Sequence, residues 1–90
     1  MSKKTKITVV GSGYVGMSLS VLFAQNNDVI VLDIDAKRVK SINNKISTVA
    51  DSGIEDFLAR KSLSLTATMD KLAAYQGSSF IVVATPTNYD

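Results

Sequence analysis

The sequence predicts an α/β fold in which a doubly wound parallel sheet has helices on both faces. Short apolar segments alternate along the chain with segments whose apolar residues recur at helical spacing. The short segments hardly alternate with polar residues, which is typical of strands covered on both faces. A glycine-rich turn joins the first of them to the first predicted helix. Together these observations favour parallel strands connected by helices.

The first half of the chain predicts two strands, each followed by a helix. In chain order we expect a buried strand at 7–10, a helix over about 14–25, a buried strand at 29–32 and a helix capped by Asp35. The first helix is expected to carry its apolar stripe on Val15, Leu19, Leu22 and Phe23. The stripe of the second is expected on Ala36, Val39, Ile42 and Ile46.

The second half predicts shorter elements. In chain order we expect a polar loop at 47–53, a short helix from Ile54 to about Arg60, a half-exposed strand at 63–66, a short helix from Met69 to Tyr75 that Gly77 ends, and an apolar strand at 80–84. In the strand order 3-2-1-4 the last strand lies beside the first. Residues 1–90 would then form about half of a six-stranded domain, with no second domain.

Composition excludes several kinds of site. The 90 residues contain no cysteine and no histidine, which excludes a cysteine nucleophile, a thiolate metal site and the commonest general base, and we predict no catalytic residue and no metal site. The net charge of +2 is small and no aromatic residues lie among the basic ones, which disfavours a nucleic-acid partner. No apolar stretch approaches the roughly 20 residues that span a bilayer, and we expect no membrane contact and a cytoplasmic location.

The glycine-rich turn carries the candidate binding site. Gly11, Gly13 and Gly16 match the pattern G-x-G-x-x-G. The first glycine permits the tight turn, the second lets a pyrophosphate approach, and the third lets the helix pack on the sheet. With Ser12 and the helix-terminal amides of Tyr14 and Val15, they predict a Rossmann-like site for the diphosphate of a dinucleotide. The alternative is a glycine-rich turn that binds no ligand.

Asp33, at the end of the second strand, strengthens this prediction. It follows the glycine motif by about 20 residues, and its carboxylate can accept hydrogen bonds from both ribose hydroxyls of adenosine. It would repel a 2′-phosphate, so the predicted cofactor is NAD rather than NADP. Asp35 competes for this role but suits helix capping better. Arg38 is expected either to contact the adenosine region or to be a solvated helix residue.

Two threonines follow the last predicted strand. Ligands of open α/β sheets lie at the carboxyl ends of the strands, where the strand order reverses. The hydroxyls of Thr85 and Thr87 are therefore expected near the ribose or diphosphate of the cofactor. The alternative is an ordinary Thr-Pro turn that ends a strand.

The motifs resemble the UDP-glucose/GDP-mannose dehydrogenase family. Gly-Tyr-Val-Gly together with Thr-Pro-Thr is much more specific than the glycine motif alone. The Thr-Pro-Thr-Asn-Tyr ending and the pair Asn43-Asn44 most resemble the bacterial UDP-glucose 6-dehydrogenase branch, while the GDP-mannose and UDP-N-acetylmannosamine branches remain alternatives. The resemblance extends, in order, over residues 7–16, 31–35, 37–44, 65–68 and 84–89.

The resemblance implies an enzyme that oxidises the primary alcohol of a sugar nucleotide to a carboxylate with two NAD. It assigns the pyrophosphate to residues 11–16, the adenosine ribose to Asp33, the adenosine region to Arg38 and the nicotinamide side to Thr87. The family's catalytic cysteine, its lysine and the UDP-sugar pocket lie further along and are absent here. The chain is therefore expected to be a truncated portion that binds NAD weakly at most and does not catalyse.

One segment departs from the family pattern. The loop 47–53 lacks the prolines that the family usually carries there, and neither it nor Asp51 is assigned a role. Beside the dehydrogenase, two other interpretations of the whole chain remain open. A regulatory NAD-binding module of a transport system also combines a glycine loop with an acidic residue, although Thr-Pro-Thr argues against it. A third reading is a chain that holds no cofactor, because a truncated sheet leaves an uncovered strand edge through which it is expected to self-associate.

Overall fold

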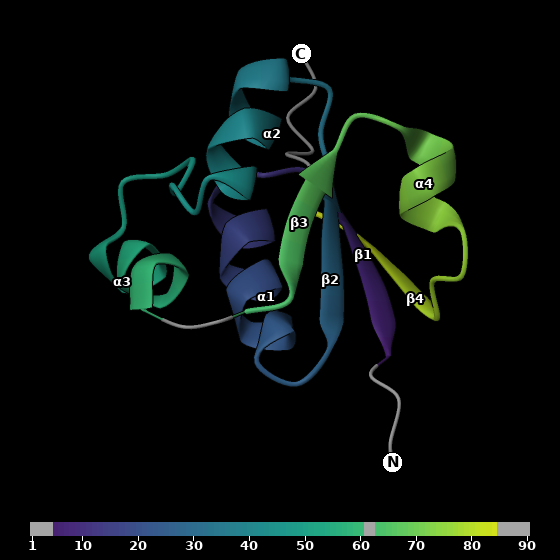
Figure 1. Cartoon of the computed structure of the whole chain (residues 1–90), viewed down its shortest axis with the longest axis horizontal. Helices are drawn as coiled ribbons and strands as arrows, with labels where there is room; N and C mark the ends of the chain where they lie inside the picture. Colours follow the sequence, from purple (N-terminus) through teal and green to yellow (C-terminus); the bar gives the residue numbers. More distant parts are fainter. Residues whose placement is uncertain (1–4, 61–62, 85–90) are drawn as a thin grey trace.

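Four parallel strands form one sheet in the order β3-β2-β1-β4, as the sequence predicts (Figure 1). The computed structural model describes residues 5–60 and 63–84. The strands are β1 (Lys6–Val10), β2 (Asp28–Leu32), β3 (Leu65–Thr68) and β4 (Phe80–Val83). The helices are α1 (Tyr14–Ala24), α2 (Ala36–Asn43), α3 (Ser52–Arg60) and α4 (Lys71–Tyr75). Within the described ranges, none of these helices is long and apolar enough to cross a membrane.

The core lies on one face of the sheet, under α1, α2 and α3 (Figure 1). Alternate strand residues point to this face because side chains alternate along a strand. The strands contribute Ile7, Val9, Val29, Val31, Leu65 and Ala67 to the core cluster, and the helices contribute Met17, Val21, Ala24, Ile42, Ile54 and Leu58. The opposite face carries α4, so helices cover both faces, as predicted.

The helix α4 is fastened to its face of the sheet by polar side chains of β1. Thr8 is fully buried, and its hydroxyl donates to the carbonyl oxygen of Ala74. Lys6 Nζ donates to the carbonyl oxygens of Ala73, at 3.0 Å, and Gln76. These bonds satisfy carbonyl groups at the end of α4 that have no partner within the helix.

Three details of the sequence prediction are wrong. Val15 and Leu22 of α1 are exposed, while Met17 and Val21 are buried. Apolar residues surround α1 on all sides, so their spacing alone does not identify the buried face. The stripe predicted for α2 is wrong at both ends: Ala36 is exposed, and Ile46 is exposed because it lies beyond Asn43, where α2 ends, and Lys45 between them takes a left-handed φ of 63°.

The third error concerns β3, which lies two residues later than predicted. The strand covers Leu65–Thr68 rather than 63–66. Its position follows from parallel pairing with β2, which aligns Leu65 with Val29 and Thr68 with Leu32. The strand does alternate between buried and more exposed residues, as expected for a half-exposed strand.

The outer edge of β3 is closed by a side chain from α2. The Asn43 amide donates to the carbonyl oxygen of Ala67 at 3.0 Å and accepts from the Ala67 N–H at 2.8 Å. Asn43 thus makes both hydrogen bonds that a neighbouring strand would make at Ala67. Within the described chain β4 pairs with β1 alone, and Phe80, Ile81 and Val83 are exposed.

Candidate dinucleotide-binding site

The first glycine makes the turn out of β1. Gly11 has a φ of 103°, a conformation that residues with a Cβ rarely adopt. Its N–H donates to the carbonyl oxygen of Leu32 at 2.8 Å, so the turn stays attached to the end of β2. The backbone of this tight turn therefore favours glycine at position 11, as the sequence predicts.

The third glycine lets α1 pack against this turn. A Cβ built on Gly16 lies 2.1 Å from the carbonyl oxygen of Gly11, a contact that no side chain can make without moving the backbone. Gly16 is buried in the first turn of α1. The close approach predicted between helix and sheet is therefore present.

Neither the backbone conformation nor the packing of the fold requires a glycine at the second position, Gly13. A Cβ built on Gly13 has no atom within 4 Å, and its φ of −74° suits any residue. Gly13 caps α1 without a side-chain hydrogen bond, and its carbonyl oxygen accepts from Met17 N at 2.9 Å. The side chains of Tyr14 and Val15 are exposed. No side chain caps the amides at the start of α1, and a glycine beside them suits the close approach of a diphosphate to the backbone.

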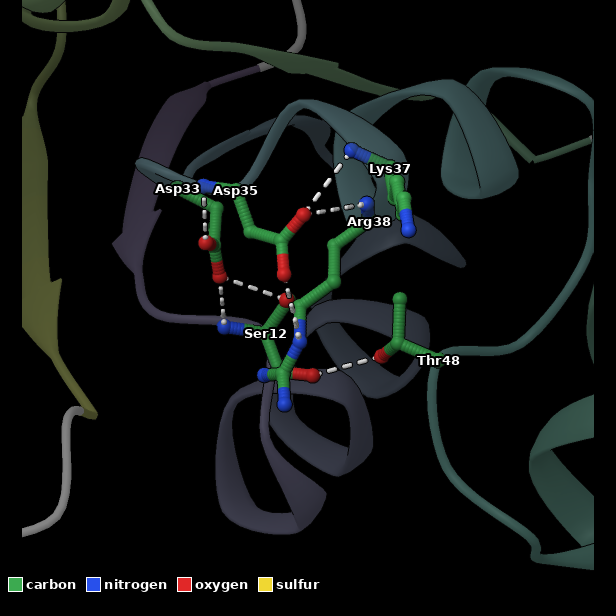
Figure 2. Close-up of polar contacts among 6 residues, drawn as sticks. All are labelled: Ser12, Asp33, Asp35, Lys37, Arg38 and Thr48. Atoms are coloured by element: carbon green, nitrogen blue, oxygen red, sulfur yellow. Dashed lines mark hydrogen bonds and ion pairs between the residues drawn. The ribbon is translucent and has the colours of Figure 1, made fainter.

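The carboxylate of Asp33 lies against the glycine turn (Figure 2). Its Oδ2 accepts from the Ser12 N–H at 2.9 Å and from the Ser12 hydroxyl at 2.5 Å. Its Oδ1 accepts from the Asp35 N–H at 2.9 Å. The ends of β1 and β2 are therefore joined through one carboxylate, which keeps acceptor capacity for further donors.

These contacts keep Asp33 ionised. Its partial burial acts to raise the pKa, since it disfavours the charged form. The Ser12 hydroxyl, the amides of Asp35 and Ser12, and the charge of Arg38 together outweigh burial, and the pKa lies below its ordinary value. At neutral pH the site presents a fixed negative charge that accepts hydrogen bonds.

Asp35 caps α2, as predicted. Its side chain accepts from the amides of Lys37 at 2.9 Å and Arg38 at 3.4 Å. Arg38 Nε lies 3.8 Å from Asp35 Oδ2, and the arginine side chain runs back from α2 toward the acidic pair (Figure 2). Both side chains of this ion pair are about half exposed, so it adds little stability. Arg38 stays available to a ligand beside Asp33.

A cavity of about 320 Å³ adjoins the carboxylate. It lies between the ends of β1 and β2 and the helix α4, and Asp33, Ile34, Met69, Lys71 and Tyr75 contribute to its walls. The lining is mainly apolar, with two charged groups at its rim, which suits a flat heteroaromatic ring.

The structure brings together most of the residues predicted for the site. Residues 11–16, Asp33 and Arg38 lie at the carboxyl ends of β1 and β2, whereas the predicted Thr85 and Thr87 lie outside the described residues. Ser12 is 1% exposed and directs its side chain to Asp33, so it supports the carboxylate from within. Two residues near the site were not predicted from the sequence. Met69 lines the cavity, and its position directly after β3, at the edge of the sheet where ligands bind, could have indicated this. Thr48 contacts Ser12, and nothing in the sequence around it indicates that contact.

Fold and site together define a dinucleotide-binding domain of the Rossmann type. The open position at Gly13, the uncapped amides of α1 and the ionised Asp33 fit a dinucleotide with a diphosphate and an adenosine ribose. Residues 5–90 match the NAD binding domain of the UDP-glucose/GDP-mannose dehydrogenase family, and the chain belongs to that family. NAD is the cofactor of this domain. The predicted resemblance is confirmed.

Individual relatives agree with this assignment. The chain is 47% identical over 85 residues to a UDP-glucose 6-dehydrogenase of Streptococcus pneumoniae and 45% identical over 87 residues to one of Campylobacter jejuni. These matches cover 94% of the chain but 22% of each relative, so the chain spans about a fifth of their length. A GDP-mannose dehydrogenase from Pseudomonas aeruginosa, solved as a ternary complex, superposes with a TM-score of 0.86 at 25% identity, over 93% of this chain and 20% of that one.

Proposed function

We propose that this chain is the N-terminal NAD-binding portion of a UDP-glucose 6-dehydrogenase. The parent protein would oxidise UDP-glucose to UDP-glucuronate in two steps, each with one NAD. The identity to two bacterial enzymes of that name, over 94% of the chain, supports the choice of UDP-glucose over other sugar nucleotides. The carboxylate of Asp33 beside the glycine turn supports the choice of NAD.

In this proposal the amides of Gly13, Tyr14 and Val15 hold the diphosphate, and Asp33 accepts hydrogen bonds from the adenosine ribose. Arg38 lies on the adenosine side, where its positive charge partly offsets the negative charges of Asp33 and Asp35. The roles of Thr85 and Thr87 stay predictions from sequence.

The cavity beside Asp33 is proposed to take the adenine ring. Ile34, Met69 and Tyr75 give it apolar walls, and it opens directly from the carboxylate that would hold the ribose. A ring seated against these apolar walls would be partly removed from water, which favours binding in proportion to the apolar area covered.

NAD supplies the hydride acceptor of the parent reaction. The residues of this chain bind and orient it, and no cysteine or histidine is present to act on a sugar nucleotide. We therefore propose that the chain binds NAD weakly and does not turn over UDP-glucose. A cytoplasmic location of the parent protein stays a prediction.

Calorimetric titration of NAD and NADP into the chain and two variants tests this proposal. Asp33→Ala removes the proposed ribose acceptor, and Asp28→Ala makes the same charge change at the opposite end of β2. We expect NAD to bind more tightly than NADP, to lose about tenfold or more in affinity in Asp33→Ala, and to be unaffected in Asp28→Ala. Equal affinity in both variants would remove Asp33 from the site.

A further inference from the structure

The segment predicted as a loop at 47–53, to which no role is assigned, reaches the glycine turn; its last two residues belong to α3, which begins at Ser52 rather than at the predicted Ile54. Thr48 Oγ1 donates to the carbonyl oxygen of Ser12 at 2.5 Å (Figure 2). All three polar groups of Ser12 are thereby engaged: its N–H and hydroxyl bind Asp33, and its carbonyl oxygen accepts from Thr48. A residue that is 1% exposed is held from two sides by different segments of the chain.

Thr48 is itself held in place by its neighbours. The Ser47 hydroxyl donates to the Val49 carbonyl oxygen at 2.7 Å and accepts from the Val49 N–H at 3.1 Å, which closes a small turn around Thr48. Asp51 then caps α3, since its Oδ1 accepts from the Ile54 N–H at 3.0 Å, and Ile54 is buried in the core. The loop therefore has a defined shape without the family's prolines.

The bond from Thr48 sets the direction of one peptide group. The chain has no cis peptide bond among the described residues, and in a planar trans peptide the C=O and the following N–H point in opposite directions. With the Ser12 carbonyl turned toward Thr48, the Gly13 N–H points away from the loop. No hydrogen bond joins that N–H to any residue in the described part of the chain.

We propose that Thr48 is a positioning residue that fixes the Ser12–Gly13 peptide so that the Gly13 N–H faces the diphosphate of NAD. The inference rests on the proposed function for the ligand, while the peptide orientation itself is a property of the free chain. Without the hydroxyl the peptide can rotate, and binding of a diphosphate must then first restore its direction. Contacts to the adenosine, which Asp33 makes, do not depend on it.

The test compares Thr48→Val, which keeps the branched shape but removes the hydroxyl, with Thr48→Ser, which keeps the hydroxyl. Thr66→Val is the matched control, because Thr66 is exposed on β3 away from the turn. Adenosine and ADP-ribose are titrated into each chain by NMR. We expect Thr48→Val to weaken ADP-ribose by about five- to tenfold and to leave adenosine unchanged, with Thr48→Ser close to the wild type. Equal weakening of both ligands would overturn the proposal.

A second measurement needs no ligand. Loss of the hydrogen bond should shift the Ser12 carbonyl carbon and the Gly13 amide resonances in Thr48→Val and leave them in place in Thr66→Val. Unchanged resonances in Thr48→Val would overturn the proposed peptide orientation. If the wild-type chain binds no ADP-ribose at all, the proposed NAD function of this chain fails, and with it the ligand half of the inference, whereas the resonances still decide the orientation.

Discussion

Two glycines of the G-x-G-x-x-G motif should respond differently to replacement by alanine, one by losing stability and the other by losing NAD binding. Gly16→Ala should destabilise the fold, because its Cβ would lie 2.1 Å from the Gly11 carbonyl oxygen. Gly13→Ala should leave stability nearly unchanged, because its Cβ meets nothing within 4 Å, yet it should abolish NAD binding. The first glycine serves the packing of α1, and the second serves the ligand.

The magnitudes follow from these contacts. In Gly16→Ala the helix and the turn must separate by roughly 1 Å, and because a backbone atom is in the way we expect the upper end of overpacking costs, about 3 kcal/mol. In Gly13→Ala the reduced freedom of the unfolded chain stabilises by about 0.4–1 kcal/mol. Alanine is a poorer N-cap than glycine, which costs a comparable amount, so the net change stays within about 0.5 kcal/mol.

Urea denaturation followed by circular dichroism measures both variants. With a slope of about 1 kcal/mol per molar urea, a loss of 3 kcal/mol moves the midpoint by roughly 3 M, which is a large share of the stability of a domain this small. Calorimetry then reports NAD binding by the folded Gly13→Ala chain. If Gly13→Ala loses as much stability as Gly16→Ala, the glycine at 13 serves the fold, and the reasoning that reserves its place for a ligand is wrong.

Three further predictions concern the carboxylate and the two sheet edges. The pKa of Asp33 is lower in the folded chain than in the unfolded chain, where it is about 4, so Asp33 stabilises the fold above that pH and this stabilisation is lost as the pH falls through the folded pKa. Asp33→Asn should therefore make the free energy of unfolding, measured by urea titration, less dependent on pH in the acid range. The same pH dependence in the variant and the wild type would contradict this prediction. Asn43→Ala should lose about 2 kcal/mol of unfolding free energy because two backbone groups of Ala67 lose their partners, whereas Asn44→Ala should not. Ile81→Lys should reduce concentration-dependent self-association in sedimentation velocity runs; association equal to that of the wild type would mean that copies do not meet at β4.

The sequence was sufficient to predict the strand order and the place of the glycine turn and Asp33 at the ends of the first two strands. The runs that became β1 and β2, Ile-Thr-Val-Val and Val-Ile-Val-Leu, favour strands because they are short, rich in β-branched residues and followed by glycine or aspartate. Asp33 and Asp35 could be told apart since one follows a strand and the other precedes a helix: Asp35 caps α2 as predicted, and Asp33 lies against the glycine turn. Local spacing carried this information.

Other features depend on contacts between distant parts of the chain. The buried face of α1 could not be read from an element that is apolar all round, and β3 took its register from β2 rather than from its own alternation. The bond between Thr48 and Ser12 joins residues 36 positions apart, and that between Thr8 and Ala74 joins residues 66 apart. No pattern within either segment predicts such pairs, because each depends on how distant segments pack against one another.

Because Asn43 closes the edge of the sheet at β3, a further strand can be added more easily at the other edge, beside β4. Where Asn43 already occupies the backbone of Ala67, a further strand must first displace an amide that makes two hydrogen bonds. At β4 it has nothing to displace within the described chain. A strand supplied in trans, as a separate polypeptide, would therefore join the domain at one place and align with Phe80–Val83. The edge of β4 is accordingly the place to target with a synthetic strand peptide, whose binding would be expected there and not at β3.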